Sequence, residues 1–368
     1  MGVYQPLSET VINGYRLLAP LNNQDAGFSK WGFAAKGGQI YFLKEFLNPV
    51  YPPDNAPYSE DMKQKIRDNC QSYERRQIRL YTAINEASDG NLVRILDFFR
   101  CGSRYYIATR RIDSAGMNVD SAAKLPMQDK VRICLALSHA LMNMHRAGMI
   151  HGDIKANNIL FEKTPRGSVT AKIIDVDDSF FEGAPPEALV GDLVYFAPER
   201  AKVFLNQMQP EKLNCKVDVF SMGLFFHEVL TGAFPEIAET YTYAFESCLD
   251  GKAPAVSGAL PARLRALLEG MLKSEPEQRL SMEEVFQELQ AYFTGFGKAP
   301  NPPRPAPKPE PKPMPTPKPE PKPRPKPKPE PKSDTGGVRF GPGIGPNAKI
   351  KDQQEPASME RFTEAGDL

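Results

Sequence analysis

Two short segments concentrate side chains that suit chemistry on phosphate groups. Residues 151–158 read His-Gly-Asp-Ile-Lys-Ala-Asn-Asn and contain Asp153, Lys155 and Asn158, and Asp175 follows seventeen positions after Asn158. Carboxylate and amide oxygens are ligands that Mg²⁺ prefers, and a further carboxylate can orient an attacking hydroxyl group. A lysine can neutralise charge on a phosphate in transfer. These are residue types that metal-assisted phosphoryl transfer would require.

These segments resemble the catalytic loop and the metal-binding motif of eukaryotic-type (Hanks-type) protein kinases. The resemblance implies that Asp153 orients the hydroxyl group and that Lys155 neutralises the transferred phosphate. It also implies that Asn158 and Asp175 hold Mg²⁺, or alternatively Mn²⁺, and that ATP is the phosphate donor. Lys155, two residues after the aspartate, resembles the pattern of serine/threonine kinases more than that of tyrosine kinases.

Three later motifs follow in the order of the same family. Residues 191–199 resemble the end of the activation segment, and residues 218–223 resemble the start of a buried helix whose aspartate holds the catalytic loop. Residues 275–279 resemble the motif whose arginine pairs with the activation-segment glutamate, so we expect Glu199 to pair with Arg279. Small-molecule kinases generally lack these three motifs, which favours a protein kinase.

The first third of the chain supplies candidates for nucleotide binding. Lys44 ends the run Tyr-Phe-Leu-Lys, which resembles the Val-Ala-Ile-Lys motif of the family's phosphate-gripping lysine. Thr109 aligns with the gatekeeper position, and the residues after it, expected to contact adenine, are Arg110, Arg111 and Ile112.

The usual partner of this lysine is a glutamate on the following helix. We predict Glu74, because Ile78 and Tyr81 would then lie on the same helix face. Glu60 and Asp68 are the alternatives.

The chain departs from the family in the glycine-rich loop. In the best register, residues 24–31, only Gly27 is a glycine, Phe28 keeps the aromatic tip, and Trp31 occupies the final apolar position. We expect these three residues to contact the nucleotide, and backbone N–H groups of such a loop can still bind phosphate.

Three further departures fall within the catalytic motifs. The metal-binding motif Asp-Phe-Gly reads Asp-Val-Asp, which places Asp177 where the family has glycine. The arginine that normally precedes the catalytic aspartate is Gly152, and the threonine expected near the end of the activation segment is Asp192. Because Gly152 offers no side chain to a phosphate, we predict that phosphorylation of segment 175–199 does not switch on the protein.

Periodicity places these motifs in two lobes. Short β-prone runs at residues 15–18, 31–35 and 39–43, a helix near 61–85 and strands near 92–99 and 104–112 come first. From residue 126 onward, apolar residues recur at helical spacing. We therefore expect an α+β, bilobal, protein-kinase-like fold. The predicted parts are a mainly β N-lobe (12–112), a larger mainly α C-lobe (113–296), a linker (297–335) and a tail (336–368).

The linker is a proline-rich segment in which the sequence Lys-Pro-Glu-Pro-Lys recurs every ten residues. Seventeen of the 36 prolines of the chain lie between residues 300 and 331. Such a segment favours an extended polyproline II conformation, either as a stiff spacer or as a ligand for an aromatic groove of the SH3 or WW kind. The glycine-rich residues after it predict a mostly disordered tail.

Composition limits the other functions. The 368 residues carry a formal net charge of +1, which argues against a globally basic nucleic-acid binder. The longest strongly apolar stretch has about 12 residues, too short to span a bilayer, and no signal peptide is recognisable. Five scattered cysteines without a CxxC motif favour a reducing, cytoplasmic location.

These observations together predict an ATP-dependent serine/threonine kinase that acts on proteins and, as one target, on its own tail. We expect a bacterial signalling protein. A catalytically weak pseudokinase that acts as a scaffold is the main alternative, because the glycine-rich loop is degraded. A small-molecule kinase is the third possibility, but it leaves the three later motifs unexplained.

Overall fold

The fold is taken from a computed structural model of the chain. It describes residues 10–23, 29–112, 116–164, 167–186, 189 and 191–296. The predicted linker and tail (297–368) lie outside the described residues, as do Gly27 and Phe28 of the predicted glycine-rich loop.

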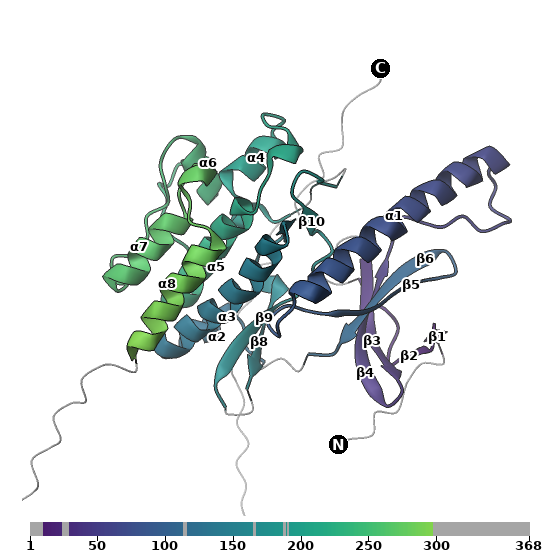
Figure 1. The fold of residues 1–368 in the computed structure, drawn as a ribbon, viewed down its shortest axis with the longest axis horizontal. Helices are drawn as coiled ribbons and strands as arrows, with labels where there is room; N and C mark the ends of the chain where they lie inside the picture. Colours follow the sequence, from purple (N-terminus) through teal and green to yellow (C-terminus); the bar gives the residue numbers. More distant parts are fainter. Residues whose placement is uncertain are drawn as a thin grey trace, which may run out of the picture. The chain divides into compact units, whose positions relative to one another are not determined.

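The N-terminal lobe is built on one six-stranded antiparallel sheet with the strand order β1-β2-β3-β4-β6-β5 (Figure 1). The strands are β1 (Val11–Ile12), β2 (Tyr15–Leu17), β3 (Ser29–Lys36), β4 (Gln39–Phe46), β5 (Ile95–Cys101) and β6 (Arg104–Arg110). Gly37 and Gly38 join β3 to β4, and both have positive φ angles (57° and 75°), which a tight two-residue hairpin turn requires.

The strand register assigns the predicted nucleotide-binding residues to one face of this sheet. Trp31 pairs with Lys44, Phe33 pairs with Phe42, and Phe42 in turn pairs with Thr109. Directly paired residues of antiparallel strands lie on the same face. All five side chains therefore share a face, while the opposite face carries a separate apolar cluster of Ile12, Tyr15, Leu17, Ala34, Leu43, Tyr106 and Ala108.

The long helix α1 (Glu60–Ala87) covers part of the face that carries Lys44. Its start is fixed by Ser59, whose side chain accepts a hydrogen bond from the backbone N–H of Met62. The Tyr73 ring lies 6.4 Å from the ring of Phe46 and 5.2 Å from that of Tyr105, which anchors the helix to β4 and β6.

The C-terminal lobe is mainly helical, as Figure 1 shows for α3, α5, α7 and α8. The helices are α2 (Val119–Ala122), α3 (Met127–Arg146), α4 (Pro198–Phe204), α5 (Lys216–Thr231), α6 (Ala244–Leu249), α7 (Ala262–Met271) and α8 (Met282–Gly295). Helix α5 is apolar around most of its circumference and lies in the core, so it provides a rigid base for the loops above it. The predicted α+β two-lobed fold is confirmed.

Two short strand pairs frame the loop that follows α3. Strand β7 (Met149–Ile150) pairs with β10 (Phe180–Phe181), and β8 (Ile159–Lys163) pairs with β9 (Val169–Ile173). The predicted catalytic loop runs between β7 and β8. The predicted metal-binding motif follows β9 directly, which brings the two motifs together.

None of the helices in the described ranges combines the length and the apolar composition that crossing a bilayer requires.

Candidate active site

The loop between β7 and β8 gathers three of the predicted catalytic side chains around one carboxylate oxygen. Asp153 is buried, and its Oδ2 lies 2.8 Å from Lys155 Nζ and accepts a 2.8 Å hydrogen bond from Asn158 Nδ2. Asn158 Nδ2 also donates to the backbone carbonyl of Asp153 at 2.8 Å. Asp153, Lys155 and Asn158, which the sequence motif identified, therefore hold the loop together by contacts with one another.

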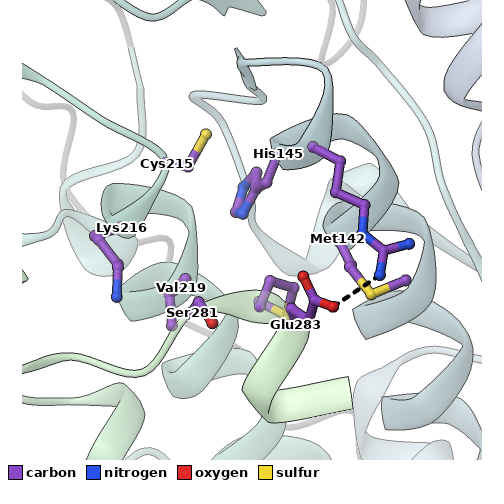
Figure 2. A pocket seen from close by; sticks show the side chains of 9 residues that line it. Met142, His145, Cys215, Lys216, Val219, Ser281 and Glu283 are labelled. Carbon is purple, nitrogen blue, oxygen red and sulfur yellow. Dashed lines mark hydrogen bonds and ion pairs between the residues drawn. The ribbon is translucent and has the colours of Figure 1, made fainter. Parts of the chain in front are cut away.

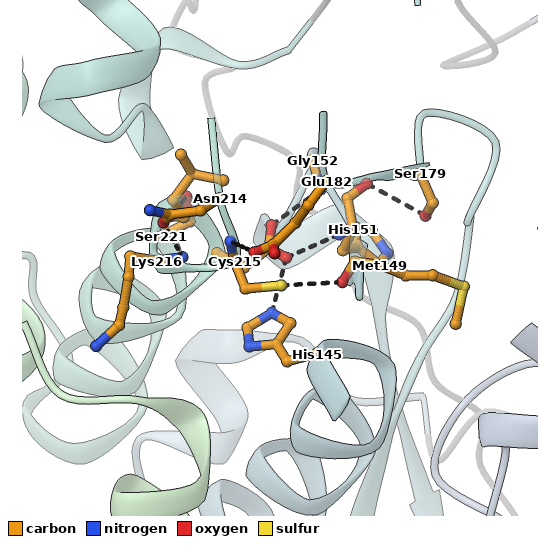
Figure 3. A network of polar contacts seen from close by, with 12 residues as sticks. His145, Met149, His151, Gly152, Ser179, Glu182, Asn214, Cys215, Lys216 and Ser221 are labelled. Atoms are coloured by element: carbon orange, nitrogen blue, oxygen red, sulfur yellow. Dashed lines mark hydrogen bonds and ion pairs between the residues drawn. The ribbon is translucent and has the colours of Figure 1, made fainter. Parts of the chain in front are cut away.

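The backbone of this loop is held from below by Asp218 of α5. Asp218 Oδ2 accepts a 2.7 Å hydrogen bond from the backbone N–H of His151, and Oδ1 accepts one of 2.9 Å from that of Gly152. His145 Nε2, at the end of α3, lies 3.0 Å from Oδ2 (Figure 3). The aspartate of the predicted buried helix thus fixes the entry of the catalytic loop.

Burial alone would raise the pKa of Asp218. The hydrogen bond and charge of His145, the charge of His151 and the backbone N–H of Gly152 outweigh burial and lower this pKa. The network therefore favours the ionised carboxylate.

The predicted metal ligand Asp175 follows β9 and lies beside the catalytic loop. The backbone N–H of Ile174 donates to the carbonyl oxygen of Asn158 at 2.8 Å. Asp175 itself has a φ of 57°, a left-handed conformation that a residue with a side chain seldom adopts. Such strained backbone is typical of functional sites.

Lys44 reaches the same place from the sheet of the N-terminal lobe. Its Nζ lies 2.9 Å from Asp175 Oδ1 and 3.0 Å from Oδ2, and 2.5 Å from Asp177 Oδ2. Burial alone would lower the pKa of Lys44, but the charges of Asp177 and Asp175 raise it. The charged form of the lysine is therefore strongly favoured.

The two carboxylates differ in environment. The Asp175 side chain is 38% exposed, and interactions with Lys44 lower its pKa despite the cost of burial. Both oxygens of Asp177 are buried, and this burial raises its pKa against the opposing charge of Lys44. Asp175 is thus the carboxylate that remains accessible for a metal ion.

The predicted ion pair between Lys44 and Glu74 is wrong. Glu74 Oε1 instead accepts a 2.6 Å hydrogen bond from the hydroxyl group of Tyr105. Ile78, which was expected to share the inner face of the helix with Glu74, is 57% exposed. Glu74 is thus engaged by Tyr105 and not by Lys44.

Neither alternative partner meets Lys44. Glu60 lies in the first turn of α1 and pairs with Lys63 at 2.9 Å, while Asp68 accepts a hydrogen bond from Gln64. Among the described residues, the ion-pair partners of Lys44 are Asp175 and Asp177. The sequence showed the aspartate in place of glycine, but it did not show that this carboxylate would turn toward the lysine.

The remaining predicted nucleotide contacts lie on the same sheet face as Lys44 or directly after it in the chain. The Trp31 and Phe42 rings stack with centroids 5.6 Å apart, and Phe33 meets both rings edge-on. Thr109 is buried next to this group in β6, and the strand ends at Arg110, so Arg111 and Ile112 lead out of the sheet. The Arg111 guanidinium lies 5.3 Å from the centre of the Phe33 ring.

The guanidinium group of Arg200 lies beside Gly152, at the position where the family has an arginine side chain. Arg200 of α4 donates a short hydrogen bond from Nη1 to the carbonyl of Gly152, and it packs 5.0 Å over the Phe196 ring. A Cβ atom on Gly152 would lie 2.9 Å from the carbonyl oxygen of Asp178 and 3.4 Å from this nitrogen. Glycine thus permits the close approach, which sequence reasoning missed.

The expected pair between Glu199 and Arg279 is present and buried. Arg279 Nη1 donates to Glu199 Oε1 at 2.7 Å, and Arg279 Nη2 donates to Glu199 Oε2 at 3.1 Å. Asp192, in the position where threonine was expected, caps the short helix Leu193–Tyr195 by accepting from the backbone N–H of Val194 at 3.0 Å.

A separate hollow of about 190 Å³ lies among α3, α5 and the start of α8 (Figure 2). Met142, His145 and Glu283 are among its lining residues, and Glu283 pairs with Arg146 at 2.9 Å on its rim. None of the predicted catalytic or metal-binding side chains lines it. It is therefore not the candidate active site.

The donor set around Asp153 fits a magnesium–nucleotide complex. No group of three or more His, Cys, Asp or Glu side chains in the described part of the chain could hold a metal ion by itself. Mg²⁺ is commonly held by one or two protein oxygens together with substrate phosphates. Asp175 and Asn158 can provide such oxygens, and Lys44 provides a cation for the phosphates.

Comparison with known proteins agrees with this geometry. The family model described as the protein kinase domain matches residues 61–290, which excludes the strands up to Lys44. The Aurora kinase of Schizosaccharomyces pombe is 24% identical over 263 residues, which cover 68% of this chain and 67% of that protein.

Two other relatives match shorter parts. Calcium-dependent protein kinase 2 of Oryza sativa subsp. japonica is 30% identical over 163 residues, 43% of this chain and 30% of that protein. A Clostridium perfringens protein named "Probable serine/threonine-protein kinase CPE1738" is 24% identical over 217 residues, 57% of this chain and 30% of that protein. The chain thus spans only part of the length of these relatives.

Proposed function

Because the chain belongs to the family of protein kinase domains, we propose that it is a serine/threonine kinase that phosphorylates hydroxyl groups of proteins with ATP. The observation that carries this proposal is the convergence of Asp153, Lys155 and Asn158 of one lobe with the Lys44–Asp175 pair across the lobes. These are the groups that phosphoryl transfer requires.

Asp153 orients the protein hydroxyl group. Its Oδ2 is engaged by Lys155 and Asn158, so the other oxygen, Oδ1, accepts the hydroxyl proton. Lys155 lies next to the Asp153 carboxylate and neutralises negative charge on the phosphoryl group during transfer. The closed loop keeps these groups in fixed positions, so little reorganisation accompanies the reaction.

Asp175 and Asn158 would hold Mg²⁺, and Lys44 would bind the phosphates of ATP. A metal ion held by these two residues would supply positive charge to stabilise the phosphates during transfer. Lys44 must then turn from Asp175 toward the phosphates, which its flexible side chain allows.

The aromatic group formed by Trp31, Phe33 and Phe42 is the proposed contact surface for adenine. Aromatic rings favour stacking with a base, and these rings lie on the same sheet face as Lys44. The backbone after Thr109, at residues 110–112, would supply the hydrogen bonds to the base edge. Gly27 and Phe28 remain proposed phosphate contacts.

A scaffold without turnover is the second candidate function. The stacked Trp31 and Phe42 rings occupy the part of the sheet face proposed for adenine, and Lys44 is held by two carboxylates. If these contacts persist, ATP does not enter. The proline-rich segment would then act as the ligand of a groove-type partner.

Protein substrates, action on the tail and a cytoplasmic location complete the proposal. The linker and the tail contain hydroxyl residues, and their covalent connection to the kinase domain would raise the effective concentration of these residues at the site. The hydroxyl residues are Thr316, Ser333 and Thr335 of the linker and Ser358 and Thr363 of the tail.

Equilibrium binding of ATP with Mg²⁺ separates the kinase from the scaffold. We expect binding that weakens at least tenfold in Asp175→Ala when Mg²⁺ is present and changes little when it is absent. Asp178→Asn is not suitable as a control because it adjoins the site, so exposed Asp120→Asn serves instead. A parent chain that binds no ATP at millimolar concentration would refute the proposed kinase.

A further inference from the structure

Asp177 is the second carboxylate in contact with Lys44. Its Oδ2 is 2.5 Å from Lys44 Nζ, and both of its oxygens are buried. The Lys44 side chain is itself only 12% exposed, so it cannot rely on water to stabilise its charge. A buried charge that loses its partner is costly, which makes this contact important for the position of the lysine.

The other partner, Asp175, cannot fill this role throughout the reaction. Asp175 is the accessible carboxylate and the proposed metal ligand. When it binds a metal ion, its charge is shared with that ion and its grip on Lys44 weakens. Asp177 is the partner that remains.

The inner face of α1 explains why a carboxylate from elsewhere is needed. Tyr73, Gln77 and Tyr81 are spaced by four residues and therefore lie along one helix face. Burial, and to a lesser extent the charge of Asp177, raises the pKa of both tyrosines, which places this face beside Asp177. Gln77 lies between them, so an amide occupies the middle of this helix face.

Gln77 is 6% exposed, and its Oε1 atom is buried without a hydrogen-bond partner among the described residues. It carries no charge and does not pair with Lys44. Glu74, one turn earlier, is held by the Tyr105 hydroxyl group. Helix α1 therefore presents no carboxylate to the lysine.

We propose that Asp177 is the positioning residue for Lys44, and that it replaces the carboxylate that the family resemblance places on α1. The amide of Gln77 on the inner face of α1 and the carboxylate of Asp177 are then complementary features of the same site. Asp177 holds Lys44 in the cleft while Asp175 is free to bind metal. This inference rests on the proposed function, since it assigns Lys44 to nucleotide binding.

The test moves the carboxylate between the two positions. Asp177→Asn removes it, and the exchange variant Asp177→Asn with Gln77→Glu restores it from the helix with the same number of carboxylates and amides. The measurement is the dissociation constant of TNP-ATP with Mg²⁺. We expect Asp177→Asn to weaken binding at least tenfold and the exchange variant to recover to within threefold of the parent.

Two results would overturn the inference. Either Asp177→Asn binds TNP-ATP as tightly as the parent, or the exchange variant folds and binds no better than Asp177→Asn. Gln77→Glu alone is the matched control. It is expected to give no gain in affinity, because it adds a second carboxylate beside Asp177.

A nucleotide-free measurement keeps the inference separate from the proposed function. Urea unfolding is compared for the parent, Asp177→Asn, Lys44→Met and the double variant. We expect Asp177→Asn to raise the unfolding equilibrium constant at least fivefold in the parent but not in the Lys44→Met background. An equal rise in both backgrounds would show that Asp177 is not the partner of Lys44.

A parent that binds no TNP-ATP would contradict the proposed kinase. The unfolding comparison would then still decide the pairing of Asp177 with Lys44, and it also decides the case in which the exchange variant does not fold.

Discussion

Arg279 and Glu199 form a bidentate pair across 80 positions of sequence, with both side chains almost completely buried. The same guanidinium also donates to the carbonyl oxygens of Lys216 and Ser274, at 2.6 and 3.1 Å. It thereby ties the end of the activation segment to the base of α5 and to the loop before α8. The main effect of such a pair on stability is that each buried charge keeps a counter-charge, because a buried charge without a partner is strongly destabilising.

Arg279→Met is expected to lower the free energy of unfolding by about 3–5 kcal/mol, because Glu199 would be left buried without a counter-charge. The measurement is urea unfolding. Arg263→Met is the matched control, since Arg263 pairs with Glu288 at 2.9 Å but both side chains are about half exposed. That change should cost at most about 1 kcal/mol. Equal losses in the two variants would contradict the role assigned to burial.

Asp218→Asn is expected to lower both stability and activity. An amide cannot accept from the backbone N–H groups of both His151 and Gly152 without turning its own N–H₂ group toward one of them. Each hydrogen bond to a charged group is worth about 1.5–3 kcal/mol, so the loss should be at least of that order. Urea unfolding measures it, and an unchanged midpoint would argue against the network.

The lowered pKa of Asp218 predicts the direction of a pH effect. An aspartate in the unfolded chain takes up its proton near about pH 3.9, whereas the folded chain resists protonation to lower pH. The stability that Asp218 contributes is therefore complete above this unfolded pKa and is lost as pH falls through the folded pKa. The slope of unfolding free energy against pH below about pH 4 should be smaller in Asp218→Asn than in the parent.

Local spacing made much of the candidate site predictable. Asp153, Lys155 and Asn158 belong to one loop, so their sequence spacing alone brings them together. Asp175 and Glu199 were identified by motifs whose order along the chain is informative. In these cases the fold only had to bring short, recognisable segments into contact.

The orientation of α1 could not be predicted in the same way. The helix carries charged residues on several sides, so Glu74, Glu60 and Asp68 were all candidates, and none of the three pairs with Lys44. Ile78 is 57% exposed, whereas Tyr81 is 3% exposed, which shows that apolar character alone did not mark the inner face. A better signal was the spacing of Cys70, Gln77 and Ile84, which are all buried.

The two unforeseen contacts depend on tertiary structure. Asp177 could be recognised as a replacement of glycine, but its contact with Lys44 requires both lobes. Arg200 approaches Gly152 from α4, nearly fifty residues away. Neither contact leaves a local pattern in the sequence.

The activation segment is expected not to require phosphorylation. Its hydroxyl groups in the described residues are those of Ser179 and Tyr195, and both are buried. Ser179 donates to the carbonyl of His151 at 3.2 Å, and Tyr195 donates to Glu228 at 3.1 Å. The guanidinium next to Gly152 is already engaged by that residue's carbonyl.

The initial kinase rate before and after phosphatase treatment checks this prediction, with intact-mass measurement as the control for complete dephosphorylation. We expect the two rates to agree within about threefold. A fall of more than about tenfold, equivalent to about 1.4 kcal/mol, together with a mapped phosphate on Ser179 or Tyr195, would show that the segment is a phosphorylation switch.

The tail is expected to be a substrate of its own kinase. Phosphosite mapping of the full chain after incubation with ATP and Mg²⁺ should find phosphate on hydroxyl residues beyond position 300. Asp153→Asn, treated identically, should carry none of it. Phosphate confined to residues 12–296 of the active parent would refute this prediction.

The most direct test of the proposed kinase activity is the rate of phosphoryl transfer from radiolabelled ATP to protein by the parent and by Asp153→Asn. We expect a fall of at least about 100-fold, near 2.7 kcal/mol of transition-state stabilisation. Urea unfolding should confirm that the variant is folded, and exposed Asp120→Asn should keep the parent rate. An Asp153→Asn chain that transfers phosphate as fast as the parent would contradict the catalytic role of Asp153.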